Sequence, residues 1–180
     1  MDKWKNISQK SIYKARFFEV KEKVALLPNN KKHIYATVER RPTVSVFPLT
    51  DRNDLYLVSE YRQLFEKKIL GAVAGHIDEN ETSLVAAKRE LKEEVGMSAY
   101  QWEEIARIEK SASVIKETCH IFLARDLERG KPEPEEGEDI ELVKLSLKEA
   151  ATKVMSGEIN NASTMIGILI LDKLRSEKKL

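Results

Sequence analysis

The chain has 180 residues, the size of one ordinary domain. Its 31 Lys and Arg residues are balanced by 30 Asp and Glu residues, so a net charge of +1 gives no field to hold nucleic acid non-specifically. An apolar content of 42%, with only 7 glycines and 5 prolines, excludes a disordered or fibrous chain. No apolar run reaches the roughly 20 residues of a membrane-spanning helix. With no secretory signal and a single cysteine, we expect a cytoplasmic protein.

The first sixty residues contain short runs of β-branched and aromatic residues between turn signals, a pattern typical of β-strands. Two polar segments, residues 28–31 and 50–54, are rich in turn-forming residues and would join the flanking runs into two hairpins. The sequence therefore predicts a strand-rich, antiparallel N-terminal third. The five predicted strands are residues 15–20, 23–27, 34–38, 44–49 and 55–58.

The hydrophobic period changes to that of a helix over residues 82–95. Apolar residues recur there every three or four positions, as a helix with one buried stripe requires. Gly96 follows this segment, and glycine is a frequent helix terminator. The sequence therefore predicts a helix that ends at Val95. Its predicted buried stripe is Leu84, Ala87, Leu91 and Val95.

Strand-like runs resume after this helix, and the C-terminal segment returns to a helical period. An acidic loop interrupted by proline, residues 131–139, precedes the last strand-like run. The order of strands, helix, strands and helices predicts an α/β (α+β) fold in which a mixed β-sheet is sandwiched between helices. The predicted strands are residues 102–108, 118–123 and 140–147, and the predicted helices are residues 148–156 and 162–174.

Three acidic residues, Glu90, Glu93 and Glu94, lie close together on the predicted helix. Glu90 and Glu94 are four residues apart, about one helical turn, so they share one face. Carboxylates this close raise one another's pKa unless a cation neutralises them, and Mg²⁺ prefers carboxylate oxygens. A solvated charged face is the alternative, because Glu and Lys are good helix formers. The run of acids taken alone favours this alternative.

The spacing of the surrounding residues favours the metal site. Gly75 is followed after five residues by Glu81 and, after seven more, by Arg89-Glu90-Leu91-Lys92-Glu93-Glu94-Val95-Gly96-Met97. This stretch matches every fixed position of the Nudix box, the signature of hydrolases that act on nucleoside diphosphates linked to another group. By this resemblance the chain is identified as a member of the Nudix hydrolase superfamily, and the Nudix fold is expected.

The resemblance implies a set of metal ligands. In Nudix enzymes the glutamates that correspond to Glu90 and Glu94 bind the catalytic ions, and the one that corresponds to Glu93 assists. The ions polarise the pyrophosphate and activate water. The carbonyl just before the box glycine, here that of Ala74, is a further ligand in related enzymes. The cofactor implied is Mg²⁺, with Mn²⁺ as its substitute, bound as two or three ions.

Two further box residues receive roles from the same resemblance. Arg89 is expected to orient the carboxylates during catalysis, because arginine pairs bidentately and stays charged. Gly75 is expected at the substrate site, in a backbone turn that a side chain would obstruct.

The resemblance extends over about residues 12–175 and is closest to ADP-ribose pyrophosphatases and related hydrolases of nucleoside diphosphate sugars. The strand that ends at Arg62 resembles the strand before the box in these enzymes, where the arginine contacts substrate. A plain surface charge is the alternative for Arg62. The acidic segment 136–141 resembles the one before their last strand, which maps Glu138 onto a metal ligand and Glu136 onto the catalytic base. A charged loop without a function is the alternative there.

Two positions depart from the pattern of ADP-ribose pyrophosphatases. Gly71 stands where these enzymes commonly have a glutamate, and Ala112 stands where they have a proline associated with ADP-ribose specificity. Further along, Glu117 is expected to face the sugar end of the substrate, and a cross-strand partner for a lysine is the alternative. These departures leave the metal chemistry intact and leave the identity of the substrate open.

The implied function is Mg²⁺-dependent hydrolysis of the pyrophosphate bond of nucleoside diphosphate sugars such as ADP-ribose, ADP-glucose or GDP-mannose. The products would be a nucleoside monophosphate and a sugar phosphate. Two alternatives stay open: a hydrolase selective for one sugar nucleotide such as GDP-mannose, and a catalytically weak regulator that binds nucleotide sugars. All the box glutamates are present, which favours catalysis.

The expected organisation is an N-terminal unit, residues 1–42, followed by a Nudix hydrolase domain, residues 43–180. ADP-ribose pyrophosphatases pair through N-terminal strands that help to build the partner's substrate pocket. The resemblance therefore implies an additional N-terminal antiparallel sheet and a homodimer formed through it. We expect a nucleotide-sugar substrate and neither a nucleic-acid nor a membrane partner.

Overall fold

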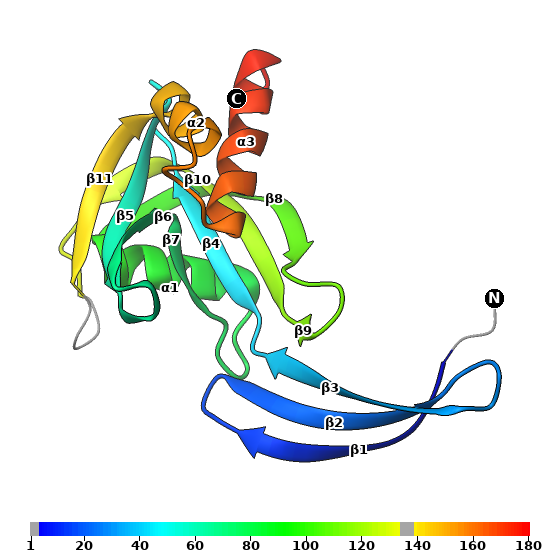
Figure 1. The fold of residues 1–180 in the computed structure, drawn as a ribbon. Coiled ribbons are helices and arrows are strands. Elements are labelled where there is room, and N and C mark those ends of the chain that lie inside the picture. The colour runs from blue at the N-terminus through cyan, green and yellow to red at the C-terminus, as the bar shows by residue number, and fades with distance from the viewer. Residues whose placement is uncertain (1–3, 134–138) are drawn as a thin grey trace. The chain divides into compact units, whose positions relative to one another are not determined.

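The computed structural model describes residues 4–133 and 139–180, and its internal contacts divide the chain into two units (Figure 1). The first unit consists of residues 1–42 together with 109–118. The second consists of residues 43–108 and 119–180. A segment from the middle of the sequence therefore packs with the N-terminal strands.

The first unit is a four-stranded sheet with the strand order β1-β2-β3-β9. β1 pairs antiparallel with β2, β2 pairs antiparallel with β3, and the short β9 pairs parallel with β3. The additional N-terminal sheet predicted from the sequence is confirmed. Its strands are β1 (Lys5–Lys14), β2 (Phe18–Leu26), β3 (Lys32–Arg40) and β9 (Ile115–Lys116).

Two details of this sheet were wrong in the sequence analysis. The strands predicted at residues 15–20 and 23–27 correspond to the single strand β2, in which the charged residues between them, Lys21 and Glu22, belong to the ladder with β3. β1 was not predicted at all. Every residue of β1 is exposed, so no alternation between buried and exposed positions marks it in the sequence.

The second unit contains two further sheets, with the strand orders β7-β4-β10-β8 and β11-β5-β6. No helix in the described residues is long and apolar enough to span a bilayer. The strands are β4 (Thr43–Pro48), β5 (Asp54–Arg62), β6 (Lys67–Gly71), β7 (Val73–His76), β8 (Met97–Glu109), β10 (Thr118–Arg129) and β11 (Ile140–Ser146). The helices are η1 (Gln63–Phe65), α1 (Ser83–Val95), α2 (Leu147–Met155) and α3 (Ala162–Ser176).

The central strands of the second unit are covered by helices on both faces. Successive residues of a strand point to opposite faces, and β4 shows this directly. Val46 packs in a cluster with Leu91 of α1, whereas Phe47 packs in another cluster with Ile168 of α3. Figure 1 shows α1 on one side of these strands and α2 and α3 on the other. The predicted mixed fold with its sheet between helices is confirmed.

The second predicted hairpin was wrong. β4 and β5 lie in different sheets, and only an isolated bridge between Leu49 and Leu55 joins them. The turn itself forms as expected, with the Thr50 amide donating to the Asp54 carbonyl. Both strands are buried on both faces, so their residue patterns do not show which neighbour each one pairs with.

The buried face of α3 is formed partly by small and polar residues. The buried positions include Thr164, Gly167 and Ile168, whereas Leu169 is 40% exposed. A Cβ at Gly167 would overlap the ring of Phe47, so the helix approaches the sheet at its smallest residue. Because apolar residues occur on nearly all sides of this helix, their period does not identify the buried face.

Candidate active site

α1 is held at both ends and along one side. The Thr82 hydroxyl accepts a hydrogen bond from the Val85 amide at the N-terminus. Gly96 adopts a left-handed conformation (φ 63°) at the C-terminus, where its amide donates to the last turn. The predicted stripe is buried at Leu91 and its neighbours, but Leu84 is 36% exposed, so that part of the prediction was wrong. The helix presents its remaining side to β7.

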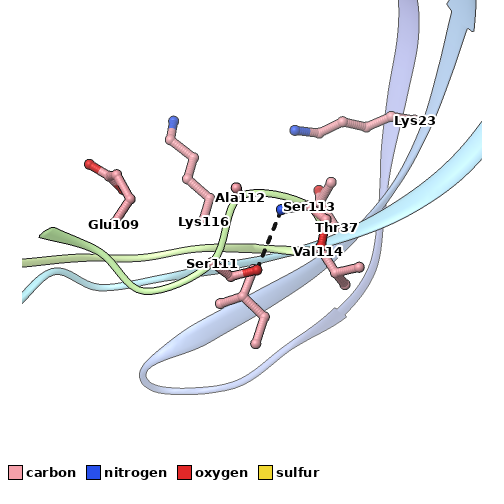
Figure 2. A pocket seen from close by; sticks show the side chains of 9 residues that line it. Lys23, Thr37, Glu109, Ser111, Ala112, Ser113, Val114 and Lys116 are labelled. Carbon is pink, nitrogen blue, oxygen red and sulfur yellow. Dashed lines mark hydrogen bonds between the residues drawn. The ribbon is translucent and has the colours of Figure 1, made fainter. Parts of the chain in front are cut away.

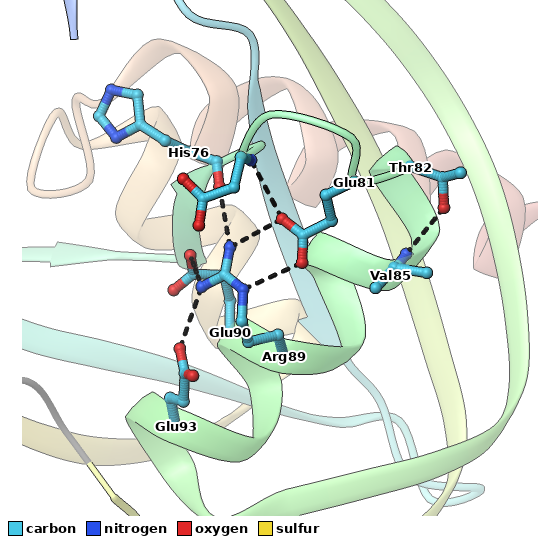
Figure 3. Close-up of polar contacts among 8 residues, drawn as sticks. His76, Glu81, Thr82, Val85, Arg89, Glu90 and Glu93 are labelled. Atoms are coloured by element: carbon cyan, nitrogen blue, oxygen red, sulfur yellow. Dashed lines mark hydrogen bonds and ion pairs between the residues drawn. The ribbon is translucent and has the colours of Figure 1, made fainter. Parts of the chain in front are cut away.

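Arg89 is the centre of a hydrogen-bond network on this helix (Figure 3). Nε and Nη2 donate to the two carboxylate oxygens of Glu81 at 3.0 and 3.1 Å. Nη1 donates to Glu90 at 2.7 Å and to Glu93 at 3.0 Å. Nη2 also donates to the carbonyl of His76 at 2.9 Å. One guanidinium therefore ties the loop before α1 to two acidic residues of the helix.

The charges in this network shift one another's protonation. The Glu81 carboxylate raises the pKa of Arg89 further above its ordinary value, against the effect of burial. Arg89 in turn lowers the pKa of Glu81, and the Asp78 amide, which donates to the same carboxylate at 3.1 Å, lowers it further. Both groups are therefore charged at neutral pH.

Gly75 makes room for the carboxylate of Glu90. A Cβ built on Gly75 would overlap that carboxylate, so β7 and α1 approach one another at the residue without a side chain. The side chain of Glu90 is only 12% exposed. Gly75 was expected in a backbone turn, but it lies in β7, where it pairs opposite Val44 of β4.

Glu94 lies deeper than the other two acids. It is 8% exposed, and its carboxylate accepts a hydrogen bond from the amide of Ala74 at 3.4 Å. Glu94 therefore lies at the boundary between α1 and β7, against the backbone of Ala74.

A model of the NUDIX domain matches residues 39–163, more than half of the chain and all of the network just described. The chain belongs to the Nudix family. The predicted superfamily and the predicted enzyme class, a Nudix hydrolase, are therefore confirmed.

Related proteins cover nearly the whole of this Nudix chain. It is 29% identical over 169 residues to an ADP-ribose pyrophosphatase of Bacillus subtilis, spanning 93% of this chain and 91% of the relative. It is 28% identical to a methanol dehydrogenase activator of Bacillus methanolicus, with 93% and 91% covered. The crystal structure of an ADP compounds hydrolase superposes with a TM-score of 0.87 at 25% identity, covering 100% of this chain and 98% of the other.

The donor set of the Nudix helix suits a hard divalent cation. Carboxylates of Glu90, Glu93 and Glu94 and the backbone of Ala74 offer only oxygen ligands on this side of α1. In the described residues no three acidic, histidine or cysteine side chains gather around a single point, and Arg89 contacts both Glu90 and Glu93. The oxygen donors fit such an ion chemically.

Two predicted site residues lie elsewhere in the described structure. Arg62 ends β5 in the second unit, where its half-exposed side chain contacts Glu60 at 2.6 Å. Glu117 belongs to the first unit, and its carboxylate is 1% exposed between Lys110 at 2.6 Å and Arg40 at 2.9 Å. The lysine pairing raised as an alternative for Glu117 is thus present. Contact of either residue with substrate stays a prediction.

The predicted base and additional ligand, Glu136 and Glu138, lie outside the described residues. The departure at Ala112 can be placed. It lies in the loop 111–116 of the first unit, which lines a cavity of about 200 Å³ together with Lys23 and other residues (Figure 2). Ala112, where the resemblance leads us to expect a proline, is therefore part of the wall of this cavity.

Sequence reasoning missed one participant. His76 was given no role, yet its carbonyl is an acceptor for Arg89. A main-chain acceptor leaves no mark on the residue type, so no sequence signal could have identified it. Glu81 was matched as a box position without a role, and the structure shows that it is the bidentate partner of Arg89.

Proposed function

We propose that this Nudix enzyme hydrolyses the pyrophosphate bond of nucleoside diphosphate sugars of the ADP-ribose type, releasing a nucleoside monophosphate and a sugar phosphate. The observation that carries the proposal is the arrangement around Arg89, which contacts Glu93 and holds Glu90 in the space left free at Gly75. The names of the relatives, ADP-ribose pyrophosphatase and ADP compounds hydrolase, support the substrate class.

We further propose Mg²⁺, with Mn²⁺ as a substitute, as two or three ions held by Glu90, Glu93, Glu94, the carbonyl of Ala74 and Glu138. Bound there, the ions would supply Lewis-acid stabilisation and an activated water. The protein contributes a fixed helix and a charged arginine that orients the carboxylates of Glu90 and Glu93.

Three remaining assignments complete the proposal. Glu136 accepts the proton as the catalytic base. Arg62 contacts the charged part of the substrate, supported by its half-exposed guanidinium at the end of β5. Glu117 contacts the sugar end.

Loss of the Arg62 guanidinium in Arg62→Met should raise KM more than it lowers kcat, because a substrate contact acts mainly on binding.

The test is product analysis of the purified protein with Mg²⁺ against ADP-ribose, ADP-glucose, GDP-mannose, UDP-glucose and diadenosine polyphosphates. Glu94→Gln should lower the rate about a hundredfold or more, because even the outer partners of metal ligands matter by 10- to 100-fold. Glu103→Gln, the same change at an exposed glutamate of β8, should keep the wild-type rate. Equal rates for wild type and Glu94→Gln would sink the proposal.

The product pattern also decides between the remaining alternatives. Preferred cleavage of ADP-ribose would show that Gly71 and Ala112 are tolerated variations, whereas preferred cleavage of GDP-mannose would show a selective hexose hydrolase. Binding of these compounds without turnover would favour a regulator.

We propose a homodimer formed through the N-terminal sheet. β1 is an edge strand whose ten residues are all exposed, including the apolar side chains of Ile7, Ile12 and Tyr13. An exposed apolar edge favours pairing with another strand. Light scattering should give twice the monomer mass, and Ile12→Lys should lower it, whereas Lys148→Glu, a charge change at an exposed residue of α2 outside the N-terminal sheet, should not. A wild-type protein that is monomeric in solution would contradict the proposed dimer and leave the proposed activity unaffected.

A further inference from the structure

At the end of β10, an arginine contacts a buried tyrosine. Arg129, the last residue of β10, donates from Nη2 to the hydroxyl of Tyr56 at 2.7 Å. Its guanidinium carbon lies 5.2 Å from the centre of the same ring. Tyr56 is only 6% exposed and packs in the cluster that includes Leu91 of α1. The arginine is therefore anchored on the same core that fixes the Nudix helix.

The residues after Arg129 bind the C-terminal end of α1. The Gly130 amide donates to the carbonyl of Gly96 at 2.5 Å, and the Glu133 amide donates to the carbonyl of Glu93 at 2.9 Å. Carbonyls at a helix C-terminus lack partners within the helix, so these bonds come from outside it. The contact is close, because a Cβ on Gly96 would overlap the backbone of residues 131–132.

We propose that Arg129 is a positioning residue of the Nudix site, which acts by fixing the segment 130–133 on the last turn of α1. Residues 130–133 are exposed, and backbone hydrogen bonds in exposed segments open readily. The contacts of Arg129 with Tyr56 hold the start of the segment in place, which keeps its amides bonded. The last turn of a helix frays easily, and this turn carries Glu93.

The same contacts set where the chain enters its acidic stretch. Residue 133 is bonded to Glu93, and on the other side Ile140 pairs with Glu60 at the start of β11. Glu133 and Ile140, which flank this acidic stretch, are therefore both bonded to residues of the second unit. This inference rests on the proposed function in so far as Glu93 is a metal ligand, but the contacts of Arg129 do not depend on it.

The first test measures the contacts without metal or substrate. Amide exchange followed by NMR should show the Gly130 and Glu133 amides exchanging about tenfold faster or more in Arg129→Met than in wild type, because a charged hydrogen bond and a cation–π contact are lost. Amides in the middle of α1 should be unchanged. Arg125→Met is the matched control, since Arg125 lies on the same strand and contacts the exposed Asp51.

The second test measures the consequence for the site. At a fixed substrate concentration, Arg129→Met should require several-fold more Mg²⁺ for half-maximal activity and should have a lower kcat, with KM at saturating Mg²⁺ unchanged. Tyr56→Phe keeps the ring and removes the acceptor, so it should show a smaller effect, and adding it to Arg129→Met should change nothing further. Arg129→Lys should restore part of the Mg²⁺ response.

Wild-type exchange at both amides in Arg129→Met would overturn the positioning role, as would faster exchange with an unaltered Mg²⁺ response. If Arg129→Met does not fold, Tyr56→Phe decides by the same two readouts. Failure of the proposed function would be recognised separately, because the wild-type protein would then hydrolyse none of the tested compounds. The amide-exchange measurement would still test whether Arg129 fixes the segment 130–133.

Discussion

Gly75 and Glu90 lie so close together that the carboxylate of Glu90 fills the space a side chain at position 75 would need. One residue belongs to β7 and the other to α1, fifteen residues later. The close approach places this carboxylate directly against the strand that also carries Ala74. It gives the box glycine a steric role that can be measured.

We expect Gly75→Ala to abolish most of the hydrolase activity. The added methyl group would displace the Glu90 carboxylate and weaken Mg²⁺ binding, seen by isothermal titration. Gly71→Ala is the matched control, because its Cβ would make only an ordinary contact with the Thr164 hydroxyl at 3.5 Å. Wild-type Mg²⁺ affinity in Gly75→Ala would contradict the steric role.

Arg89→Lys should lower activity about tenfold to a hundredfold, because an ammonium cannot reproduce the fork that reaches Glu81, Glu90 and the carbonyl of His76. The largely buried Glu81 carboxylate loses its bidentate partner. The free energy of unfolding measured in urea should therefore fall by about 1–3 kcal/mol. Arg175→Lys, a surface pair with Asp172, should change stability by less than about 1 kcal/mol. Equal effects of the two substitutions would refute this explanation.

Thr164 is predicted to be a structural residue without a part in catalysis. Its buried hydroxyl accepts a hydrogen bond from the Ala72 amide at 3.0 Å, which fixes α3 to the strand before the Nudix box. Thr164→Val should lower the free energy of unfolding by about 1–3 kcal/mol, because it leaves a buried amide without its acceptor. Thr152→Val, on the exposed side of α2, should have little effect on the same measurement.

The N-terminal sheet should lose stability in acid because of Glu39. Hydrogen bonds from Lys21 and Lys23 lower the pKa of Glu39 from 4.5 to about 2. A lowered folded-state pKa means that the stabilisation is complete above pH 4.5 and is lost as the pH falls towards 2. The stability difference between wild type and Glu39→Gln should therefore shrink over that range in thermal unfolding.

The matched control for this pH dependence is Glu22→Gln, at an exposed glutamate of β2 in the same sheet. Both variants are compared with wild type over the same range of pH. A stability difference that changes no more for Glu39→Gln than for Glu22→Gln would show that the lysine pairing does not control the acid response.

Features that depend on neighbours along the chain could be predicted from the amino-acid sequence alone. The helix period and the terminator Gly96 placed α1 to within one residue, because capping and periodicity are local. The spacing of Gly75, Arg89 and Glu90 identified the family, since residues on one helix and the loop before it keep a fixed geometry. The additional N-terminal sheet followed from the family resemblance.

Contacts between distant segments depend on how the chain packs and could not be predicted in this way. The sequence could not show that Glu94 turns towards the Ala74 amide, that β4 and β5 join different sheets, or that Arg129 lies against Tyr56. Such contacts depend on how buried strands are ordered, and strands that are apolar on both faces are compatible with several orders. The chemistry of the site is therefore written locally in the Nudix helix, whereas its position against the strands is a product of packing.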